Sequence, residues 1–597
     1  MIARSGSTLW AILPILLVLI ACTGCRSAQN LQPNLIVILA DDLGYGDLAM
    51  LGNSDVRTPH LDRMAQQSVR LDTFYAMPVC APTRAALLTG RDFLRTGVWG
   101  VHGGRDYLNL AETTIAQRLH QAGYRTAMLG KWHLGKTSGY LPHERGFDRA
   151  WTITDRLYQQ TEPVLNHNGR AYQPEGWTAE ILTDLAIREL TRHDDQRPVF
   201  LYLAHPLIHE PFYAPRQLID RYLAEGHSES LAALYAMTEH LDQEVGRLLE
   251  AVDRLDSERE TIVIFLGDNG PIGNPMNLPH LTDAEMARRN PRNWKGNKGH
   301  VWENGARVAC FVYAPRRFPP RVDRRPAGVI DLAPTLLEWA GAAAPDAQFD
   351  GVSLATRISQ PDLPVRDRHF FIATHDAMWP ARRSLYDRLP SKKDLAFEDQ
   401  VLAVRYGRFK YVQGYGGFAL HDLDHDPGEQ SDASSRFPKE RQQLEKALHA
   451  WYRGVLASDA SYAMPVFQIT GEPQVTEYAY ACAPSDLVGT LRRGSHATHD
   501  WRPGDAQSLT LDVTRAGTYQ IGIEAHIEEP GHTMELRVRA SSLKHSLSRV
   551  FSQTLGELNL EMGVQEVRVS LSEETEDKEA VIMRELQRVT FRRVTTD

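Results

Sequence analysis

A cysteine stands just before a predicted helix start in the stretch CAPTR at residues 80–84, which leads on to LTGR at residues 88–91. Proline is favoured in the first turn of a helix, where its missing N–H costs no hydrogen bond, and the residues after it are good helix formers. We therefore expect Cys80 at a helix N-terminus, where free N–H groups attract negative charge. Arg84 follows four residues later, so its side chain lies on the same face of the helix as Cys80. The spacing indicates a nucleophile that handles an anion; a buried structural cysteine is the simpler alternative.

Two pairs of oxygen-bearing residues follow apolar runs of the sequence. Asp41 and Asp42 come directly after one such run, and Asp268 and Asn269 come after another. Three carboxylates and an amide oxygen are hard donors, which suit Ca²⁺ or Mg²⁺ rather than zinc. Such residues are also common in turns after strands, so one pair alone carries little weight. Two pairs in a chain that also has the CAPTR stretch predict a metal site.

The apolar runs predict the scaffold that must position these residues. Continuous β-branched runs, typical of strands covered on both faces, occur at residues 34–40, 199–204, 261–266 and 308–313. Helical patterns lie between them, at residues 113–122 and 230–252. The alternation predicts an α/β fold with a doubly wound, mostly parallel sheet sandwiched by helices. Ligands bind such sheets at the carboxyl ends of the strands, which is where both acidic pairs stand.

A further candidate lies in GKWHLG at residues 130–135. Lys131 and His133 stand two apart in a predicted extended segment, so they point the same way and can grip one anion. A surface lysine beside a partly buried histidine is the alternative interpretation.

The twelve residues from Cys80 resemble the signature of the sulfatases, with Thr83 where most members carry serine, and GKWHLG resembles a second block of that family. The order of strand, HDLDHDPGE at residues 421–429 and closing helix is similar to the family's small C-terminal subdomain, with His421 where tyrosine is common. The resemblance spans residues 34–456. It implies a formylglycine-dependent type I sulfatase of the arylsulfatase family, within the alkaline phosphatase superfamily.

In that family a dedicated formylglycine-generating enzyme oxidises the cysteine to formylglycine (3-oxoalanine), whose hydrated aldehyde is the nucleophile. The resemblance therefore implies this modification at Cys80 and one calcium ion, Ca²⁺, per chain. The implied metal ligands are Asp41, Asp42, Asp268, Asn269 and the modified Cys80.

The resemblance also implies which side chains hold the sulfate or move protons beside the nucleophile. They are Arg84, Lys131, His133, His209 and Lys298. His205 competes with His209, because each lies one or two residues before a proline, but the following Ala214-Pro215 favours His209. Asn304, a few residues after Lys298, replaces a glycine of the family. Asparagine tolerates left-handed backbone angles, so we expect the turn to persist, and Lys295 is offset from the matching lysine position.

Five segments are predicted along the chain: a lipoprotein signal peptide at residues 1–21, a tether at 22–33, the α/β catalytic domain at 34–355, a small α+β C-terminal subdomain at 356–460 and an appended antiparallel β domain at 461–597. In the last segment apolar and polar residues alternate with period two between turns, which is typical of a β-sandwich. This domain either binds carbohydrate or packs against the enzyme, and structural support is the preferred interpretation.

The N-terminus has the features of an export signal. Arg4 precedes an apolar run at residues 9–21, which is short for a membrane span. The run ends in LIAC, which resembles a bacterial lipobox with Cys22 as the lipidated residue, and Cys25 is a weaker competitor. An ordinary signal peptide or a single anchor helix is the alternative. We expect an exported bacterial lipoprotein, periplasmic or on the cell surface, that meets the membrane only through a lipid at Cys22.

The net charge of the chain and its sulfatase-like motifs together limit the classes of function that we consider. The formal net charge of −9 over 597 residues gives no basic surface for nucleic acid. We expect hydrolysis of sulfate esters by a sulfuric ester hydrolase, with a sulfated carbohydrate or another sulfate ester as substrate. Two alternatives stay open: a phosphate or phosphonate monoester hydrolase of the same superfamily, and a non-catalytic surface lipoprotein that binds sulfated glycans.

Overall fold

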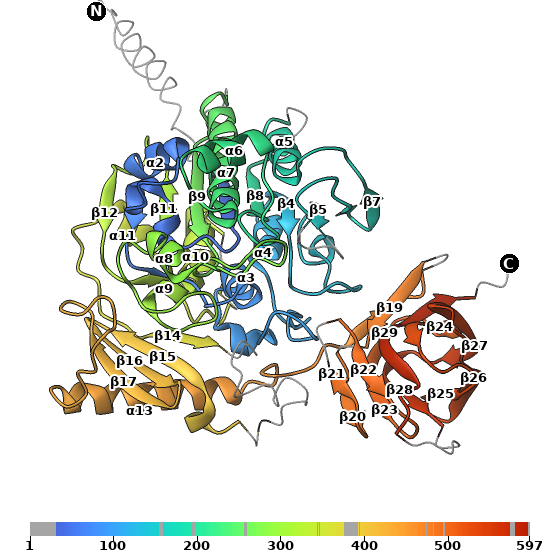
Figure 1. Ribbon diagram of the computed structural model, residues 1–597. Coiled ribbons are helices and arrows are strands. Elements are labelled where there is room, and N and C mark those ends of the chain that lie inside the picture. The colour runs from blue at the N-terminus through green and yellow to red at the C-terminus, as the bar shows by residue number, and fades with distance from the viewer. Residues whose placement is uncertain are drawn as a thin grey trace, which may run out of the picture.

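The computed structural model describes residues 31–594, apart from short gaps at 154–158, 193–196, 256–258, 343, 346, 375–391, 393–394, 473–474, 482, 494–495 and 573–578 (Figure 1). The predicted signal peptide and its lipidation residue Cys22 lie outside the described residues. Within these limits, no helix is long and apolar enough to cross a membrane.

A ten-stranded sheet forms the centre of the N-terminal part, in the order β12-β2-β11-β9-β1-β8-β4-β5-β6-β7. The strands are β1 (Asn34–Ala40), β2 (Val69–Leu71), β4 (Arg125–Lys131), β5 (Arg149–Ile153), β6 (Leu165–His167), β7 (Arg170–Tyr172), β8 (Val199–His205), β9 (Thr261–Gly267), β11 (Cys310–Tyr313) and β12 (Arg321–Asp323). β1 lies between β8 and β9 and is parallel to both, and β4 is parallel to β8 and β5. β11 is antiparallel to β9 and β2, so the sheet is mixed but mostly parallel at its centre.

Helices cover both faces of this sheet (Figure 1). Alternate side chains of β1, such as Leu35 and Val37, pack into a core with α3 (Cys80–Thr89), α4 (Ile115–Gln121) and α10 (Leu332–Trp339). The other set, such as Ile36 and Ile38, packs into a second core on the opposite face. The helices of that core are α2 (Pro59–Gln66), α5 (Thr178–Leu190), α6 (Arg216–Ala224) and α7 (Glu229–Asp253). The predicted doubly wound α/β architecture is confirmed.

The predicted strand at residues 308–313 is divided in the structure. β10 (Arg307–Val308) pairs with β3 (Phe74–Tyr75) in a three-stranded sheet completed by β13 (Ala327–Gly328), whereas β11 belongs to the large sheet. The whole run is apolar and buried, so the sequence pattern does not reveal the change of sheet at Ala309.

The next part of the chain forms a four-stranded antiparallel sheet, β14 (Phe370–Thr374), β15 (Val401–Tyr406), β16 (Phe409–Gly414) and β17 (Gly417–Asp422). The helix α13 (Pro438–Leu456) packs on it, and its Leu444, Leu448 and Tyr452 are buried (Figure 1). This is the small α+β unit expected after the catalytic region.

Two mostly antiparallel sheets, with one parallel strand pair, make up the C-terminal part, which we call the β module (residues 461–594). One contains β18 (Phe467–Ile469), β20 (Asp486–Val488), β23 (Ala506–Val513), β25 (Thr533–Val538), β26 (Ser541–Ser546) and β28 (Gly563–Leu571). The other contains β19 (Thr476–Tyr480), β21 (Arg492–Arg493), β22 (Thr498–Trp501), β24 (Gly517–Ile527), β27 (Ser552–Leu560) and β29 (Met583–Arg593). Their apolar faces share one core, which Tyr107 and Tyr140 of the N-terminal part join. The residue limits of the domains stay a prediction.

Candidate active site and metal centre

The candidate site lies where the central parallel strands end. Ala40, the last residue of β1, stands opposite Gly267 of β9 and His205 of β8. Asp41 and Asp268, which follow β1 and β9, therefore emerge at the same edge of the sheet, as the strand-end rule predicts. Both side chains are fully buried.

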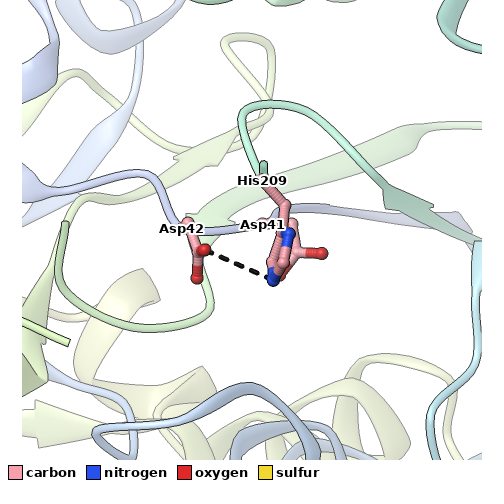
Figure 2. Close-up of side chains that lie close together, drawn as sticks. All are labelled: Asp41, Asp42 and His209. Atoms are coloured by element: carbon pink, nitrogen blue, oxygen red, sulfur yellow. Dashed lines mark ion pairs between the residues drawn. The ribbon is translucent and has the colours of Figure 1, made fainter. Parts of the chain in front are cut away.

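Asp41 and Asp42 are surrounded by side chains from other loops. His209 reaches them from the loop after β8, with its Nε2 3.5 Å from Oδ2 of Asp42 (Figure 2). Lys298 Nζ lies 2.6 Å from Oδ1 of Asp42, and Lys131 Nζ lies 2.7 Å from Oδ2 of Asp41. Two ammonium groups and two carboxylates thus occupy one buried corner.

The second acidic pair, Asp268 and Asn269, is hydrogen-bonded to Asp42 of the first. The backbone N–H of Asp42 donates to Oδ1 of Asp268 at 3.0 Å, and the side-chain amide of Asn269 donates to Oδ1 of Asp42 at 2.8 Å. Asp42 has a φ of 62°, a left-handed conformation that aspartate adopts more readily than most residues. In this conformation the backbone N–H and the side-chain carboxylate of Asp42 both face Asp268 and Asn269.

Three oxygens in this cluster are buried and lack a hydrogen-bond partner among the residues that the structure describes. They are Oδ1 of Asp41, Oδ2 of Asp42 and Oδ1 of Asn269. A buried polar atom without a partner is costly, and native proteins satisfy nearly all of them. Carboxylate and amide oxygens are the donors that hard cations such as Ca²⁺ take. The residues present therefore fit a bound divalent cation.

Cys80 begins α3, as predicted, and its thiol joins the same cluster. Its Sγ is 3.3 Å from Nδ1 of His133. The Sγ atom and carboxylate oxygens of Asp41 and Asp268 all lie within 4.8 Å of one another. The cysteine of the CAPTR stretch and the two acidic pairs, widely separated in sequence, thus converge at one point.

Arg84 is fully buried and bridges three parts of the site. Its Nη1 donates to the backbone carbonyl of Lys131 at 2.7 Å, and its Nη2 donates to Oδ2 of Asp268 at 2.9 Å. The predicted position beside Cys80, one turn along the same helix, agrees with this placement.

Lys131 and His133 both reach the site, but the segment that carries them is not extended as predicted. His133 has a φ of 60°, which lies outside the extended region. Lys131 ends β4 and contacts Asp41, whereas His133 contacts Cys80. Nε2 of His133 lies 2.6 Å from the carbonyl oxygen of Val101, which holds the ring in place.

Burial and charge shift the pKa values of these groups. Burial opposes ionisation of Asp41, yet Lys131 and the other nearby cations hold its pKa well below the usual value. Burial and the Asp41 carboxylate raise the pKa of Asp268, as expected for a crowded acidic cluster that a cation would relieve. Burial, reinforced by the charge of Lys131, lowers the pKa of His133 to about 3, and burial lowers that of His209 to about 4. A bound sulfate ester would raise both pKa values, because a nearby negative charge favours the protonated imidazole.

The two competing histidines are placed differently. His209 faces Asp42, whereas Nδ1 of His205 accepts the backbone N–H of Leu207 at 3.3 Å. His205 is fully buried at the end of β8. The geometry favours His209 for contact with a substrate, and its role stays a prediction.

The block after Lys298 differs from the expectation in one respect. Asn304 lies within the short helix α9 (Glu303–Ala306) and does not adopt a left-handed backbone; its amide donates to the carbonyl of Gly296 at 2.9 Å. Lys295 lies outside the site, with Nζ 3.9 Å from the ring centroid of Trp302.

Two groups that position side chains of the site were not predicted from the sequence. Oγ1 of Thr83 accepts the N–H of Met77 at 2.9 Å and lies 2.7 Å from the carbonyl oxygen of Asp268, so it ties α3 to the end of β9. The other is the backbone carbonyl of Val101 beside His133. A serine hydroxyl can make the bonds of Thr83, which explains the exchange, but no signal in the sequence identifies a backbone carbonyl.

The mixed sheet, the acidic centre at its strand ends and Cys80 at a helix start form an architecture consistent with the alkaline phosphatase superfamily. A family model for sulfatases matches residues 33–342. Human arylsulfatase A is 30% identical over 433 residues, which cover 66% of this chain and 82% of that protein. Mouse N-acetylgalactosamine-6-sulfatase is 29% identical over 377 residues, 57% of this chain and 69% of that protein. The chain belongs to the sulfatase family and is a sulfuric ester hydrolase.

Solved structures agree on the fold. The crystal structure of Ps i-CgsB superposes with a TM-score of 0.62 at 23% sequence identity, over 73% of this chain and 94% of that one. The same protein has been solved in complex with k-i-k-neocarrahexaose, with a TM-score of 0.60 to this chain.

Proposed function

We propose that this enzyme hydrolyses sulfate esters of carbohydrates with a formylglycine made from Cys80 and a bound Ca²⁺. The observation that carries the proposal is the convergence of Cys80 Sγ with carboxylate oxygens of Asp41 and Asp268, all within 4.8 Å of one another. A nucleophile at this position would attack an anion held by Lys131 and Lys298, beside the carboxylates that would hold the cation.

The cation would be held by Asp41, Asp42, Asp268, Asn269 and the modified Cys80. The three buried oxygens without hydrogen-bond partners among the described residues support this ligand set, and their hardness favours Ca²⁺ or Mg²⁺ over zinc. When bound, the cation supplies positive charge to the sulfuryl oxygens and thereby polarises the sulfur.

The positive side chains of the site would hold the sulfate. Lys131 and Lys298 each have an ammonium group within 2.7 Å of an acidic ligand, so they stand at the rim of the metal centre. Arg84 is fully buried behind them, where it fixes Asp268. Preorganised charge in a site that excludes water is usually the largest catalytic term, and losing one such donor costs roughly 3–4 kcal/mol.

Three residues near position 80 would accept or donate protons during the reaction. A formylglycine hydrate offers two hydroxyl groups on one carbon. One attacks the sulfur and loses its proton as the departing sugar oxygen gains one; deprotonation of the other expels sulfate and restores the aldehyde. His133, 3.3 Å from the position of Cys80 Sγ, accepts that second proton. His209 or Lys298 donates a proton to the departing sugar oxygen, because both lie on the Asp42 side of the site. A serine at position 80 would lack the second hydroxyl.

A carbohydrate substrate is supported by the relatives. Mouse N-acetylgalactosamine-6-sulfatase is named for a sulfated sugar, and Ps i-CgsB, which shares the fold, binds a carrageenan-type oligosaccharide. We also propose export and lipid anchoring at Cys22, which rests on the LIAC sequence at residues 19–22. Mass spectrometry of the N-terminal peptide from the native host tests the anchor.

The mass of the tryptic peptide at residues 71–84 tests the nucleophile. In protein from the native host, we expect this peptide to be lighter by the change from thiol to aldehyde. The same preparation is then assayed on matched sulfate and phosphate esters. A modified peptide with preference for the sulfate ester supports the proposal. An unmodified thiol would favour a non-catalytic glycan-binding lipoprotein, and preference for the phosphate ester would favour a phosphate or phosphonate hydrolase.

A further inference from the structure

Three histidine rings form a row that starts beside Cys80 and ends in the β module. His133 lies next to Cys80, and the ring centroid of His102 is 5.7 Å from that of His133. The ring centroid of His496, which belongs to the β module, is 5.3 Å from that of His102. A residue far along the chain thus lies two rings away from the nucleophile.

Solvent exposure rises along this row. His133 is 5% exposed, His102 is half-buried and His496 is exposed. The row therefore leads from the buried nucleophile to the surface of the protein. A carbohydrate whose sulfate reaches Cys80 keeps the rest of its chain nearer the surface, where it can extend to His102 and His496.

The β module is fixed against the segment that carries these rings. The hydroxyl of Tyr140 accepts the N–H of Val466 at 3.1 Å and donates to the carbonyl of the same residue at 3.0 Å. Tyr107 packs edge to face against Phe467, with 5.9 Å between the ring centroids. These contacts come from the apolar core of the module itself, so its position relative to the active site is set by buried interactions.

Close packing continues along the segment that contains His102. Gly104 has a φ of 79°, and a Cβ at this position would lie 2.4 Å from Cβ of Ala483 in the β module. The guanidinium of Arg493 lies 5.6 Å from the ring centroid of Trp99. The segment is therefore held between the catalytic region and the module, which places His496 at a defined distance from His102.

His102 is half-buried and lies near positively charged side chains and other imidazoles. Burial lowers the pKa of His102, and the positive charges of Lys136 and Arg105 lower it further, together with the neighbouring histidines. A neutral imidazole has one nitrogen that donates and one that accepts a hydrogen bond, which matches the hydroxyl groups of a sugar. Its flat ring also offers an apolar face, as ligand sites commonly do.

We propose that His102 and His496 form a binding subsite for the sugar part of a sulfated carbohydrate, so that the β module completes the substrate-binding surface. The proposal rests on the proposed function, because it places the sulfate ester at Cys80. It gives the appended domain a direct role in substrate choice. A small aryl sulfate, which ends close to the nucleophile, does not use this subsite.

The test compares two kinds of substrate, an aryl sulfate and sulfated hexasaccharides, on the full-length, modified enzyme. The variants are His102→Ala, His496→Ala and the control His545→Ala, on the edge strand β26 of the same module. The substrates are 4-nitrophenyl sulfate and hexasaccharides of chondroitin 6-sulfate and ι-carrageenan. We expect His496→Ala to lower kcat/KM for a hexasaccharide by about tenfold, the effect of one good hydrogen bond, with unchanged turnover of the aryl sulfate. His545→Ala should match the wild type on both.

Equal losses on both kinds of substrate would show that His496 only supports the fold around His133 and would overturn the proposal. So would an unchanged kcat/KM for both. Binding of the same hexasaccharides, measured by calorimetry, separates this proposal from the proposed function. Binding that weakens about tenfold in His496→Ala but not in His545→Ala supports the subsite even if the wild type shows no turnover. Hydrolysis of the aryl sulfate without binding of either hexasaccharide would overturn the subsite alone.

Discussion

The Nη2 atom of Arg84 lies 2.9 Å from Oδ2 of Asp268, and both side chains are completely buried. The other terminal nitrogen of Arg84 donates to the carbonyl of Lys131. One guanidinium thus connects the helix that begins at Cys80 to two strand ends. Its planar fork makes both directional bonds at once, which the compact ammonium of a lysine cannot do.

Arg84→Lys should keep the charge but lose this geometry. We expect kcat/KM to fall by about 10²-fold, the effect of losing one preorganised donor, and the free energy of unfolding to fall by about 1–3 kcal/mol because a buried acceptor loses its partner. Steady-state kinetics and urea unfolding measure the two effects. Arg216→Lys, in an exposed pair with Asp220, is the control. Near-normal turnover of Arg84→Lys would contradict the assignment.

Removal of the metal should abolish turnover. Dialysis against a chelator is expected to lower kcat by at least about 10²-fold, since a bound cation supplies several kcal/mol of transition-state stabilisation. Added Ca²⁺ should restore it, with about one ion per chain in elemental analysis. Asp268→Ala should lose both the ion and activity while circular dichroism shows a largely intact fold, whereas Asp220→Ala should change neither. Full activity of chelated enzyme or of Asp268→Ala would refute the ligand set.

Substitutions of His205, at the end of β8, and of His209, in the loop after it, should differ in effect. We expect His209→Ala to lower kcat by about 10²–10⁴-fold, the range for loss of a general acid, because only His209 faces Asp42. His205→Ala should lower it less, because its Nδ1 accepts a backbone N–H at the end of β8. Thermal unfolding of both variants separates loss of catalysis from loss of fold. A crippled His205→Ala beside an active His209→Ala would exchange their roles.

An ion pair between the catalytic region and the following sheet should make stability depend on pH. Lys410 Nζ lies 2.9 Å from Oε1 of Glu303, which also accepts the hydroxyl of Tyr75 at 2.7 Å. Burial would raise the pKa of Glu303, but Lys410 and two arginines lower it to about 2. The folded-state pKa is depressed, so the stabilisation is present above the ordinary carboxyl pKa and is lost as the pH falls toward 2.

The matching variant is Glu303→Gln. At pH 7 we expect it to lower the free energy of unfolding by ~3 kcal/mol, the cost of breaking a buried pair. The difference from the wild type should shrink as the pH falls from about 5 toward 2, because protonated Glu303 no longer carries the charge. Urea unfolding at several pH values measures this, with Glu398→Gln at an exposed position as the control. A difference that does not change with pH would contradict the ion pair.

Much of the fold and the location of the site follow from local patterns. The run at residues 34–40 is apolar at every position because both faces of β1 are covered, and the acidic pairs follow β1 and β9 directly. The left-handed backbone of His133 could not be predicted, because tertiary contacts to Cys80 and Val101 hold it there. Likewise, no local sequence pattern predicts the contact between His496 and His102, because this contact depends on how the β module packs.

The hydrogen bond from the backbone of Asp42 to Asp268 spans 226 residues of sequence, and the bond from Arg84 to Asp268 spans 184. Contacts between such distant residues require closure of long loops and slow the folding of a chain. Because β1 pairs with both β8 and β9, Asp41, Asp42 and Asp268 meet only after the centre of the sheet has assembled. A cation that binds there stabilises the folded domain and not its precursors. A chain that ends before β9 would contain Cys80, Asp41 and Asp42 but would lack Asp268 and Asn269, with which they form the site.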